Sequence, residues 1–212
     1  MPNHRNRMFR GKKSSAIIRH PSNNNPTTPT IFTEMTLEQF KYPIGKFENP
    51  ETITEEILAA WISAIAAFPH RLKNEVHGLN QEQLDTPYRP EGWTIRQLIH
   101  HCADSHINSY TRFKLTLTED RPTIKPYWED RWAELIDSKT LPVEYSINLL
   151  DGLHARWVGL LHSLTAQDFA KTFIHPEHKK EISLNEYVGF YAWHCNHHLA
   201  HITGVKKRNN WT

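Results

Sequence analysis

Apolar residues recur at three- and four-residue spacing through most of the chain, which is the pattern of amphipathic α-helices. No stretch alternates apolar and polar residues for long enough to predict a β-strand. The helical pattern is longest in residues 50–79, 94–118, 143–164 and 183–207. We therefore predict an all-α fold class, in which four long amphipathic helices pack as a helix bundle.

Local signals mark where these helices begin and where one of them should be interrupted. Thr94 and Gln97 have the spacing of an N-terminal capping box, and Ser183 and Glu186 repeat it. Basic residues close the last helix, as the helix dipole prefers. Pro69 falls inside the first helix and should break or kink it.

Residues 1–36 differ in composition from the rest of the chain. They contain HPSNNNPTTPT, a polar stretch without apolar periodicity, which cannot bury enough surface to offset the entropy cost of ordering. We interpret them as a disordered basic arm. The alternatives are a mis-assigned start, because Met35 opens a natural beginning, and an organelle transit peptide. Residues 37–212 are predicted to form one domain.

The net charge of +2 hides an uneven distribution of charged side chains. The first 33 residues carry six basic groups and no acid, so the rest of the chain carries 19 basic and 23 acidic groups. This acidic body argues against a nucleic-acid partner. Because no apolar run is long enough to cross a membrane or to act as a secretory signal, we expect no membrane partner and a cytoplasmic location. Cys102 and Cys195 are interpreted as buried thiols in a reducing compartment.

Four histidines fall in the segment YAWHCNHHLAHI of the last predicted helix: His194, His197, His198 and His201. At about 100° per residue, His194 and His198 share the apolar face, whereas His197 points away and His201 lies on the flank. Two imidazoles one turn apart can hold one metal ion, as in the HExxH motif. The glutamate of that motif is absent, because Cys195 follows His194. The spacing therefore predicts a metal site but excludes that protease motif.

A catalytic zinc site needs a third protein ligand beside its water. The second predicted helix offers HHCADSH, which contains His100, His101 and His106. Helical periodicity places His106 nearest the apolar centre, His101 on the flank and His100 facing outward. Periodicity alone therefore favours His106 and leaves His101 as an alternative.

Four segments are distinctive in their order and spacing: YPIGKF, LDTPYRPEGWTIRQLIHHCADSHINSYTRFKLTLTED, FIHPEH and YAWHCNHHLAHI. Together they resemble the YfiT branch of the DinB-like superfamily, which is regarded as a group of metal-dependent hydrolases. The resemblance covers about residues 42–211. It implies a DinB-like four-helix bundle, a homodimer, and one Zn²⁺ or Ni²⁺ ion per subunit.

The resemblance assigns three metal ligands, one from HCAD and two from the histidine segment: His101, His194 and His198. It thus favours His101 over His106, against the helical periodicity. Cys102 stands where the family pattern has leucine, a change that conserves packing. Asp104 lies one turn after His101 and is a candidate to accept the second N–H of a ligand imidazole. No general base is identifiable, so the catalytic residues stay unassigned.

The resemblance implies hydrolysis of a small-molecule substrate at a three-histidine zinc site with an open water position. Related members are thiol S-transferases of the bacillithiol type, so metal-dependent transfer of a low-molecular-weight thiol is the second hypothesis. A non-catalytic metal-binding stress protein is the third. We expect the loop around Tyr127 and Trp128 to line the pocket. We interpret His175 and His178 as surface loop residues, and the alternative is that they border the pocket.

Overall fold

The computed structural model describes residues 36–177 and 179–211. In chain order, their helices and strands are α1 (Leu37–Lys41), α2 (Glu55–Val76), α3 (Gln81–Leu84), α4 (Ile95–Thr118), α5 (Glu129–Trp132), α6 (Ile136–Thr140), α7 (Glu144–His162), α8 (Ala166–Phe169), β1 (Thr172–His175), β2 (Lys180–Ser183) and α9 (Leu184–Arg208). The predicted arm, residues 1–36, lies outside this part except for Thr36. The domain boundary at residue 37 therefore stays a prediction.

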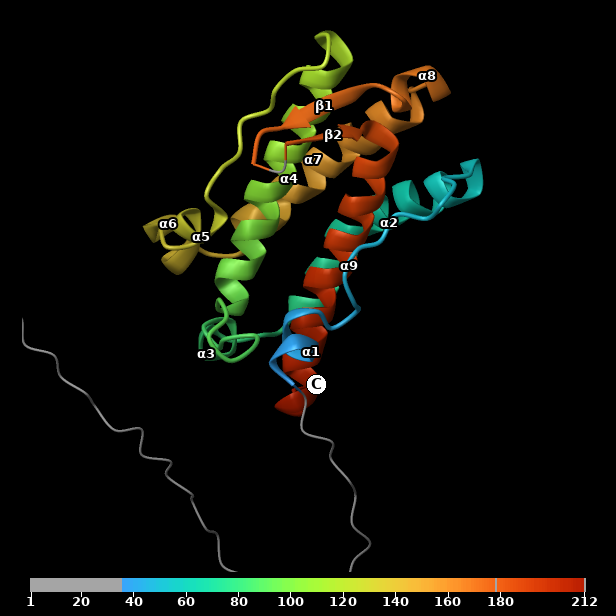
Figure 1. Ribbon diagram of the computed structural model, residues 1–212. Helices are drawn as coiled ribbons and strands as arrows, with labels where there is room; N and C mark the ends of the chain where they lie inside the picture. Colours follow the sequence, from blue (N-terminus) through green and yellow to red (C-terminus); the bar gives the residue numbers. More distant parts are fainter. Residues whose placement is uncertain (1–35, 178, 212) are drawn as a thin grey trace, which may run out of the picture. The chain divides into compact units, whose positions relative to one another are not determined.

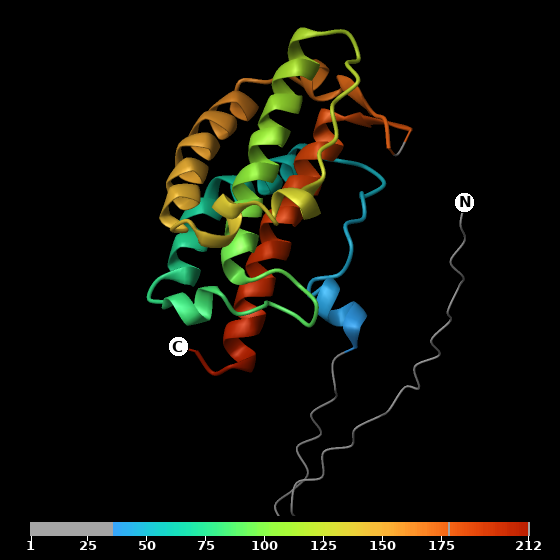
Figure 2. The same cartoon turned by 90° about the vertical axis from the view of Figure 1, so that its left-hand side faces the viewer.

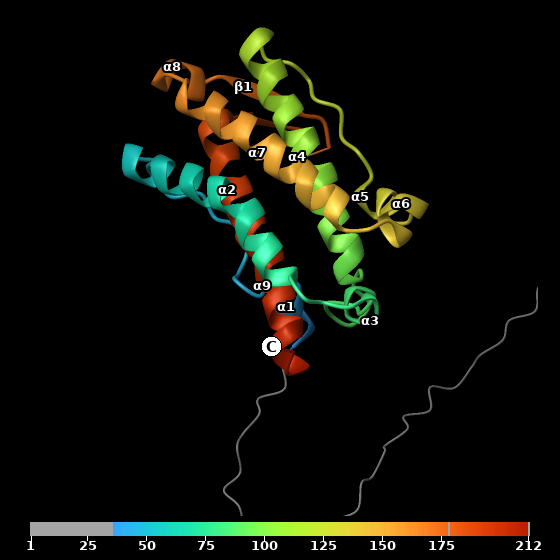
Figure 3. The ribbon, with the colours of Figure 1, turned by 180° about the vertical axis from the view of Figure 1, so that it is seen from behind.

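The four long helices α2, α4, α7 and α9 form the predicted bundle, which confirms the fold class (Figure 1). Helix α9 packs against α2 and α4, and α7 packs against the same two helices. Figure 1 has α4 and α9 towards the viewer, and the view from behind in Figure 3 has α2 and α7 there. Their inner faces meet in one apolar core, where Ile65, Leu98, Leu150 and Val188 have no exposed surface. None of the helices in the described ranges has both the length and the apolar character needed to cross a membrane.

Both predicted capping boxes are present, and they set the first residues of α4 and α9. The hydroxyl of Thr94 accepts a hydrogen bond from the backbone N–H of Gln97 at 3.1 Å, and the Gln97 side chain accepts one from the backbone N–H of Thr94 at 3.0 Å. These bonds satisfy N–H groups that have no partner inside the helix. Both predicted helix starts are confirmed.

Pro69 lies inside α2 without ending it, because the helix continues to Val76. The predicted break is therefore wrong, and the alternative, a kink at Pro69, stays a prediction. A proline has no N–H to offer the carbonyl of the residue four positions earlier, here Ile65. The missing donor comes from another helix, since Nδ1 of His154 in α7 donates to the Ile65 carbonyl at 2.7 Å. The buried carbonyl therefore keeps a partner.

A two-stranded hairpin corrects the expectation that the chain contains no strands. Strands β1 and β2 pair antiparallel, with Thr172 opposite Ser183. Each has four residues, which is too short for apolar alternation to be recognised. The hairpin stands at the end of the bundle where α9 begins (Figure 2). Ile174 ties it to the connection after α4 through backbone hydrogen bonds to Pro122 and Ile124, at 2.9 and 3.1 Å.

The segment before α2 runs along α9. The indole N–H of Trp193 donates to the carbonyl of Gly45 at 3.0 Å, and the ring of Phe47 packs edge-on against Phe190. Gly189 allows this approach, because a Cβ there would lie 2.7 Å from the Trp61 ring and 3.0 Å from Phe47. The rings of Trp61 and Phe47 can therefore approach the backbone of α9 this closely only because residue 189 is a glycine.

Two glycines inside helices should respond in opposite ways to alanine. A Cβ added at Gly159 in α7 would meet no neighbouring atom within 4 Å, so Gly159→Ala should stabilise the protein by up to about 1 kcal/mol through helix propensity. Gly189→Ala gains the same propensity but forces the Trp61 ring to move, and it should destabilise by about 1–3 kcal/mol. Urea denaturation of both variants measures the difference. Stabilisation by both substitutions would contradict the close packing at Gly189.

Candidate metal centre

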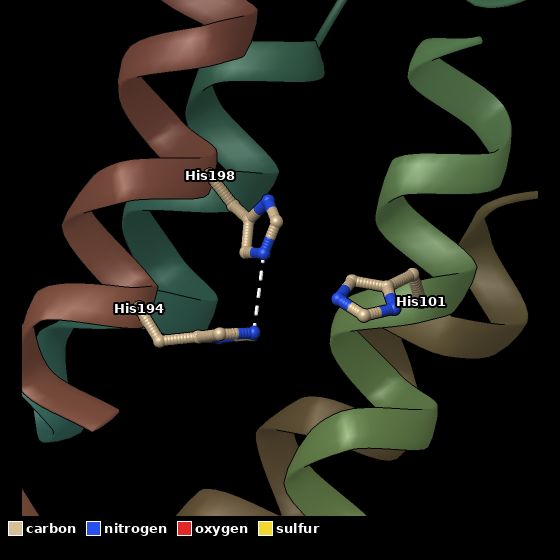
Figure 4. Close-up of side chains that lie close together, drawn as sticks. All are labelled: His101, His194 and His198. Carbon is tan, nitrogen blue, oxygen red and sulfur yellow. Dashed lines mark hydrogen bonds between the residues drawn. The ribbon is translucent and has the colours of Figure 1, made fainter. Parts of the chain in front are cut away.

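Three buried imidazoles meet between α4 and α9. His194 and His198 extend from successive turns of α9, and His101 faces them from α4 (Figure 4). One ring nitrogen from each lies within 4.8 Å of the other two. The Nε2 atoms of His194 and His198 are 3.1 Å apart. The structure thus brings together the three residues that the family resemblance selects.

The spacing of these nitrogens suits a metal ion. Tetrahedral zinc with bonds of about 2.0–2.1 Å separates its nitrogen ligands by about 3.3 Å. The 3.1 Å between His194 and His198 is close to that value, and the third nitrogen lies within 4.8 Å. Burial lowers the pKa of His101 to about 4 and the pKa of His198 well below 6.5, so both rings are neutral at pH 7. Neutral imidazoles offer the lone pair that a metal requires.

A line of hydrogen bonds connects His194 to the backbone of α2. Nδ1 of His154 donates to the carbonyl of Ile65 at 2.7 Å. His154 Nε2 lies 2.7 Å from His106 Nδ1, and His106 Nε2 lies 3.1 Å from His194 Nδ1. We name these four residues the histidine relay: Ile65, His154, His106 and His194.

The carbonyl at one end fixes where every proton in the relay lies. A carbonyl only accepts, so His154 carries its proton on Nδ1. Burial lowers the pKa of His154 to about 4 and that of His106 well below 6.5, so each neutral ring has one bare nitrogen. His154 Nε2 then accepts from His106, and His106 Nε2 accepts from His194. The lone pair of His194 is left on Nε2, the nitrogen that faces His198.

The relay also explains why His106, which helical periodicity favours, lies apart from the cluster. It is fully buried, and its ring is held between His154 and His194 by both nitrogens. His106 therefore holds the ring of His194 through a hydrogen bond and does not point towards the space between His101, His194 and His198. The apolar centre of α4 locates His106 correctly in the core but does not reveal its partners on α7 and α9.

Two histidines expected to point away from the bundle are buried, which corrects the helical-wheel placement. His100 is covered by the chain around α6 and α7, where its ring nitrogens lie 2.7 Å from Ser146 Oγ and 3.2 Å from the Leu141 carbonyl. His197 stacks on Trp193 with ring centroids 4.4 Å apart, and His201 Nε2 lies 3.1 Å from His197 Nε2. Residues of other elements contribute to this burial: Ser146 of α7 and Leu141 lie against His100, and Tyr42 lies 6.1 Å from His197 between ring centroids. A helical wheel of one helix cannot include these contacts.

The three imidazoles line a cavity of about 660 Å³. Aromatic side chains form part of its walls, among them Tyr88, Trp93, Phe190, Tyr191 and Trp193. Ser105 places a hydroxyl at this wall, 3.1 Å from the Tyr191 hydroxyl and 3.4 Å from His194 Nε2. The site is therefore a concave pocket whose lining combines aromatic side chains, the polar groups of the histidine cluster and charged side chains such as Arg112 and Glu186.

Of the two loop residues expected to line the pocket, one does and the other does not. Tyr127 lines the cavity, whereas Trp128 is 55% exposed and packs beneath the guanidinium of Arg131. His175 is buried on β1 and lines the cavity, so its interpretation as a surface residue is wrong. His178 lies outside the described residues. The β-hairpin, which the sequence did not predict, brings His175 to the pocket.

Neither cysteine supplies a nucleophile or a disulfide. Cys102 and Cys195 are free and fully buried, and burial raises the pKa of each thiol. Burial, and secondarily Asp137, raises the pKa of Asp104 to about 6. The Asp104 side chain makes no hydrogen bond to His101, His194 or His198. The hydrogen-bonding support seen for the cluster comes instead from His106 and Ser105.

This bundle with a histidine site belongs to the DinB superfamily, whose family model matches residues 64–202. A protein of Bacillus cereus strain G9842 is 55% identical over 175 residues, which is 82% of this chain and all of the relative. A protein of Bacillus mycoides strain KBAB4 is also 55% identical with the same coverage. Both carry the name "putative metal-dependent hydrolase".

The fold is also similar to a solved structure, that of YfiT from Bacillus subtilis. The two chains are 48% identical, with a TM-score of 0.81, and the match covers 82% of this chain and 99% of YfiT. YfiT is described as "a probable metal-dependent hydrolase with an unusual four-helix bundle topology". The resemblance to the YfiT branch is therefore confirmed.

The buried histidines should make stability depend steeply on pH. Burial lowers the pKa of His101, His154 and His197 to about 4, from 6.5 when exposed. Unfolding therefore takes up protons below pH 6.5, and the free energy of unfolding rises with pH there. The stabilisation is complete above about pH 6.5 and is lost as the pH falls towards 4. Each proton taken up contributes a slope of about 1.4 kcal/mol per pH unit.

Urea denaturation of chelator-treated protein between pH 8 and 4 measures this slope. The variant His154→Leu removes one buried imidazole and should reduce the slope by up to about 1.4 kcal/mol per pH unit. His162→Leu is the matched control, because His162 is exposed at the end of the same helix, α7. Stability that does not change between pH 6.5 and 4.5 would contradict the neutral state of the relay.

Proposed function

We propose that this protein is a metal-dependent hydrolase of small molecules, with one zinc ion held by His101, His194 and His198. The observation that supports it most directly is the relay, which leaves the lone pair of His194 on the nitrogen that faces His198. Three neutral ligands at the wall of a cavity match the ligand set of catalytic zinc sites. Nickel also accepts imidazole ligands and is the alternative metal.

When bound, zinc would supply a Lewis acid and a water activated near neutral pH. The chain's own groups position the substrate around it. The Ser105 hydroxyl lies beside both His194 and Tyr191, where it can exchange hydrogen bonds with a polar group of the substrate. Burial raises the pKa of Tyr191 well above 10, so its hydroxyl stays protonated.

Metal-dependent thiol transfer is the second candidate. Both cysteines are buried with raised pKa values, so any sulfur nucleophile has to come from a bound low-molecular-weight thiol. A cavity of about 660 Å³ has room for such a thiol beside an electrophile. The names of the relatives favour hydrolysis, which we therefore place first.

One equivalent of metal per chain should remain with the purified protein, as measured by elemental analysis. Replacing His101, His194 or His198 by Ala should abolish tight binding, and chelation should lower the melting temperature of the parent protein. His106→Ala should weaken binding by only about 10–100-fold, because His106 acts through His194. His162→Ala, on the surface, is the control. Tight binding in His101→Ala, with loss in His106→Ala, would contradict the proposed ligand set.

The reaction is tested with the metal-loaded protein on ester, amide and electrophile panels, each with and without a low-molecular-weight thiol. We expect turnover in water alone, and we expect His198→Ala to abolish it. Turnover that requires the thiol and yields an S-conjugate would replace hydrolysis by thiol transfer. Inactivity across all panels would favour a metal-binding protein without catalysis.

The homodimer and the cytoplasmic location implied by the sequence stay predictions. Several apolar side chains are exposed on and around α6 and on the first turns of α7, and they offer a surface on which two subunits could pack: Leu135, Ile136, Leu141, Tyr145 and Leu149.

A further inference from the structure

Arg112 is a buried cation on the wall of the cavity. It extends from α4, and 8% of the residue is exposed. Nη1 donates to the Tyr187 hydroxyl at 2.8 Å, and Nη2 donates weakly to the Lys125 carbonyl at 3.4 Å. Nε is buried and has no hydrogen-bond partner among the residues that the structure describes. Both acceptors are uncharged groups, and Arg112 makes no ion pair within residues 36–177 and 179–211.

A second buried arginine on the same helix, Arg96, has its charge neutralised by a carboxylate and serves as a comparison. Arg96 is 3% exposed, and its Nε lies 2.7 Å from a carboxylate oxygen of Asp85. Its other nitrogens donate to the Gln81 side chain at 2.6 Å and the Leu141 carbonyl at 3.0 Å. A buried charge is costly unless it is paired and fully hydrogen-bonded. Arg96 meets this condition and Arg112 does not.

None of the acidic residues that line the cavity forms an ion pair with Arg112 in the described part of the chain. Four of them are exposed: Glu91, Glu129, Asp130 and Glu177. Glu186 already accepts hydrogen bonds from the Ser183 backbone and hydroxyl in the capping box of α9. Within the described residues, no carboxylate is hydrogen-bonded or ion-paired to Arg112.

We propose that Arg112 is the anion-binding end of the pocket, and that it takes the carboxylate or phosphate of an organic ligand whose other end reaches the histidine cluster. Arg112 follows His101 by 11 residues on α4, which corresponds to about 16 Å along the helix. A ligand that spans the pocket is therefore elongated, with its anionic group remote from its reactive group. The anion site stands without the metal, and only its role in substrate recognition depends on the proposed function.

Calorimetric titration tests this with three probes of equal chain length: octanoate, octyl phosphate and 1-octanol. We expect both anions to bind the purified protein at least 10-fold more tightly than the alcohol. Arg112→Met should lose this preference and leave alcohol binding unchanged, and Arg112→Lys should restore part of it. The His198→Ala variant should keep the preference, because it lacks the proposed metal site but retains Arg112.

The stability of Arg112→Met separates a ligand-binding role from a structural one. If the cation serves a ligand, its removal should leave the free energy of unfolding unchanged or raise it, because an uncompensated buried charge is lost. Loss of stability together with an unchanged anion preference in Arg112→Lys and Arg112→Met would overturn the proposal. Equal affinity of the unmodified protein for octanoate and 1-octanol would do so as well. An anion preference without any hydrolysis would leave this site intact and reject only the proposed reaction.

Discussion

The hydrogen bond from His154 to the carbonyl of Ile65 is the interaction on which the site depends. Pro69 leaves that carbonyl without its helical donor, and the carbonyl is buried, so a donor from outside α2 is required. Because the acceptor is a carbonyl, it admits only one proton arrangement in each neutral ring that follows. The direction of the whole relay is therefore set by a proline on α2, a helix that supplies none of the candidate ligands.

The same relay joins the four long helices through polar contacts at the centre of an apolar core. Ile65 comes from α2, His154 from α7, His106 from α4 and His194 from α9. Each ring nitrogen in the line has a partner, so the network avoids the cost of a partly satisfied buried group. Sliding one helix along another would break a link and strand a buried imidazole. The relay thus fixes the relative positions of the helices as well as the orientation of His194.

The sequence predicts features that arise within one helix and fails for features that arise between elements. The capping boxes of α4 and α9 and the shared face of His194 and His198 follow from helical geometry alone. The choice between His101 and His106 does not, because both lie on the inner side of α4 and only their partners on α7 and α9 distinguish them. The continuation of α2 beyond Pro69 is not predictable from α2 alone either, because the donor to the Ile65 carbonyl comes from His154 on α7.

Arg112 and a metal ion at the histidine cluster would give the cavity two positive centres. Burial keeps His101, His194 and His198 neutral, so a divalent ion held there would retain its charge, and Arg112 adds a second positive centre farther along α4. The exposed acids stay at the rim, where water screens them. Arg112 and the three histidines are buried, and electrostatic attraction at buried groups is stronger than in water. An occupant with one negative end and one electron-rich end therefore complements the pocket better than a neutral apolar molecule of the same length.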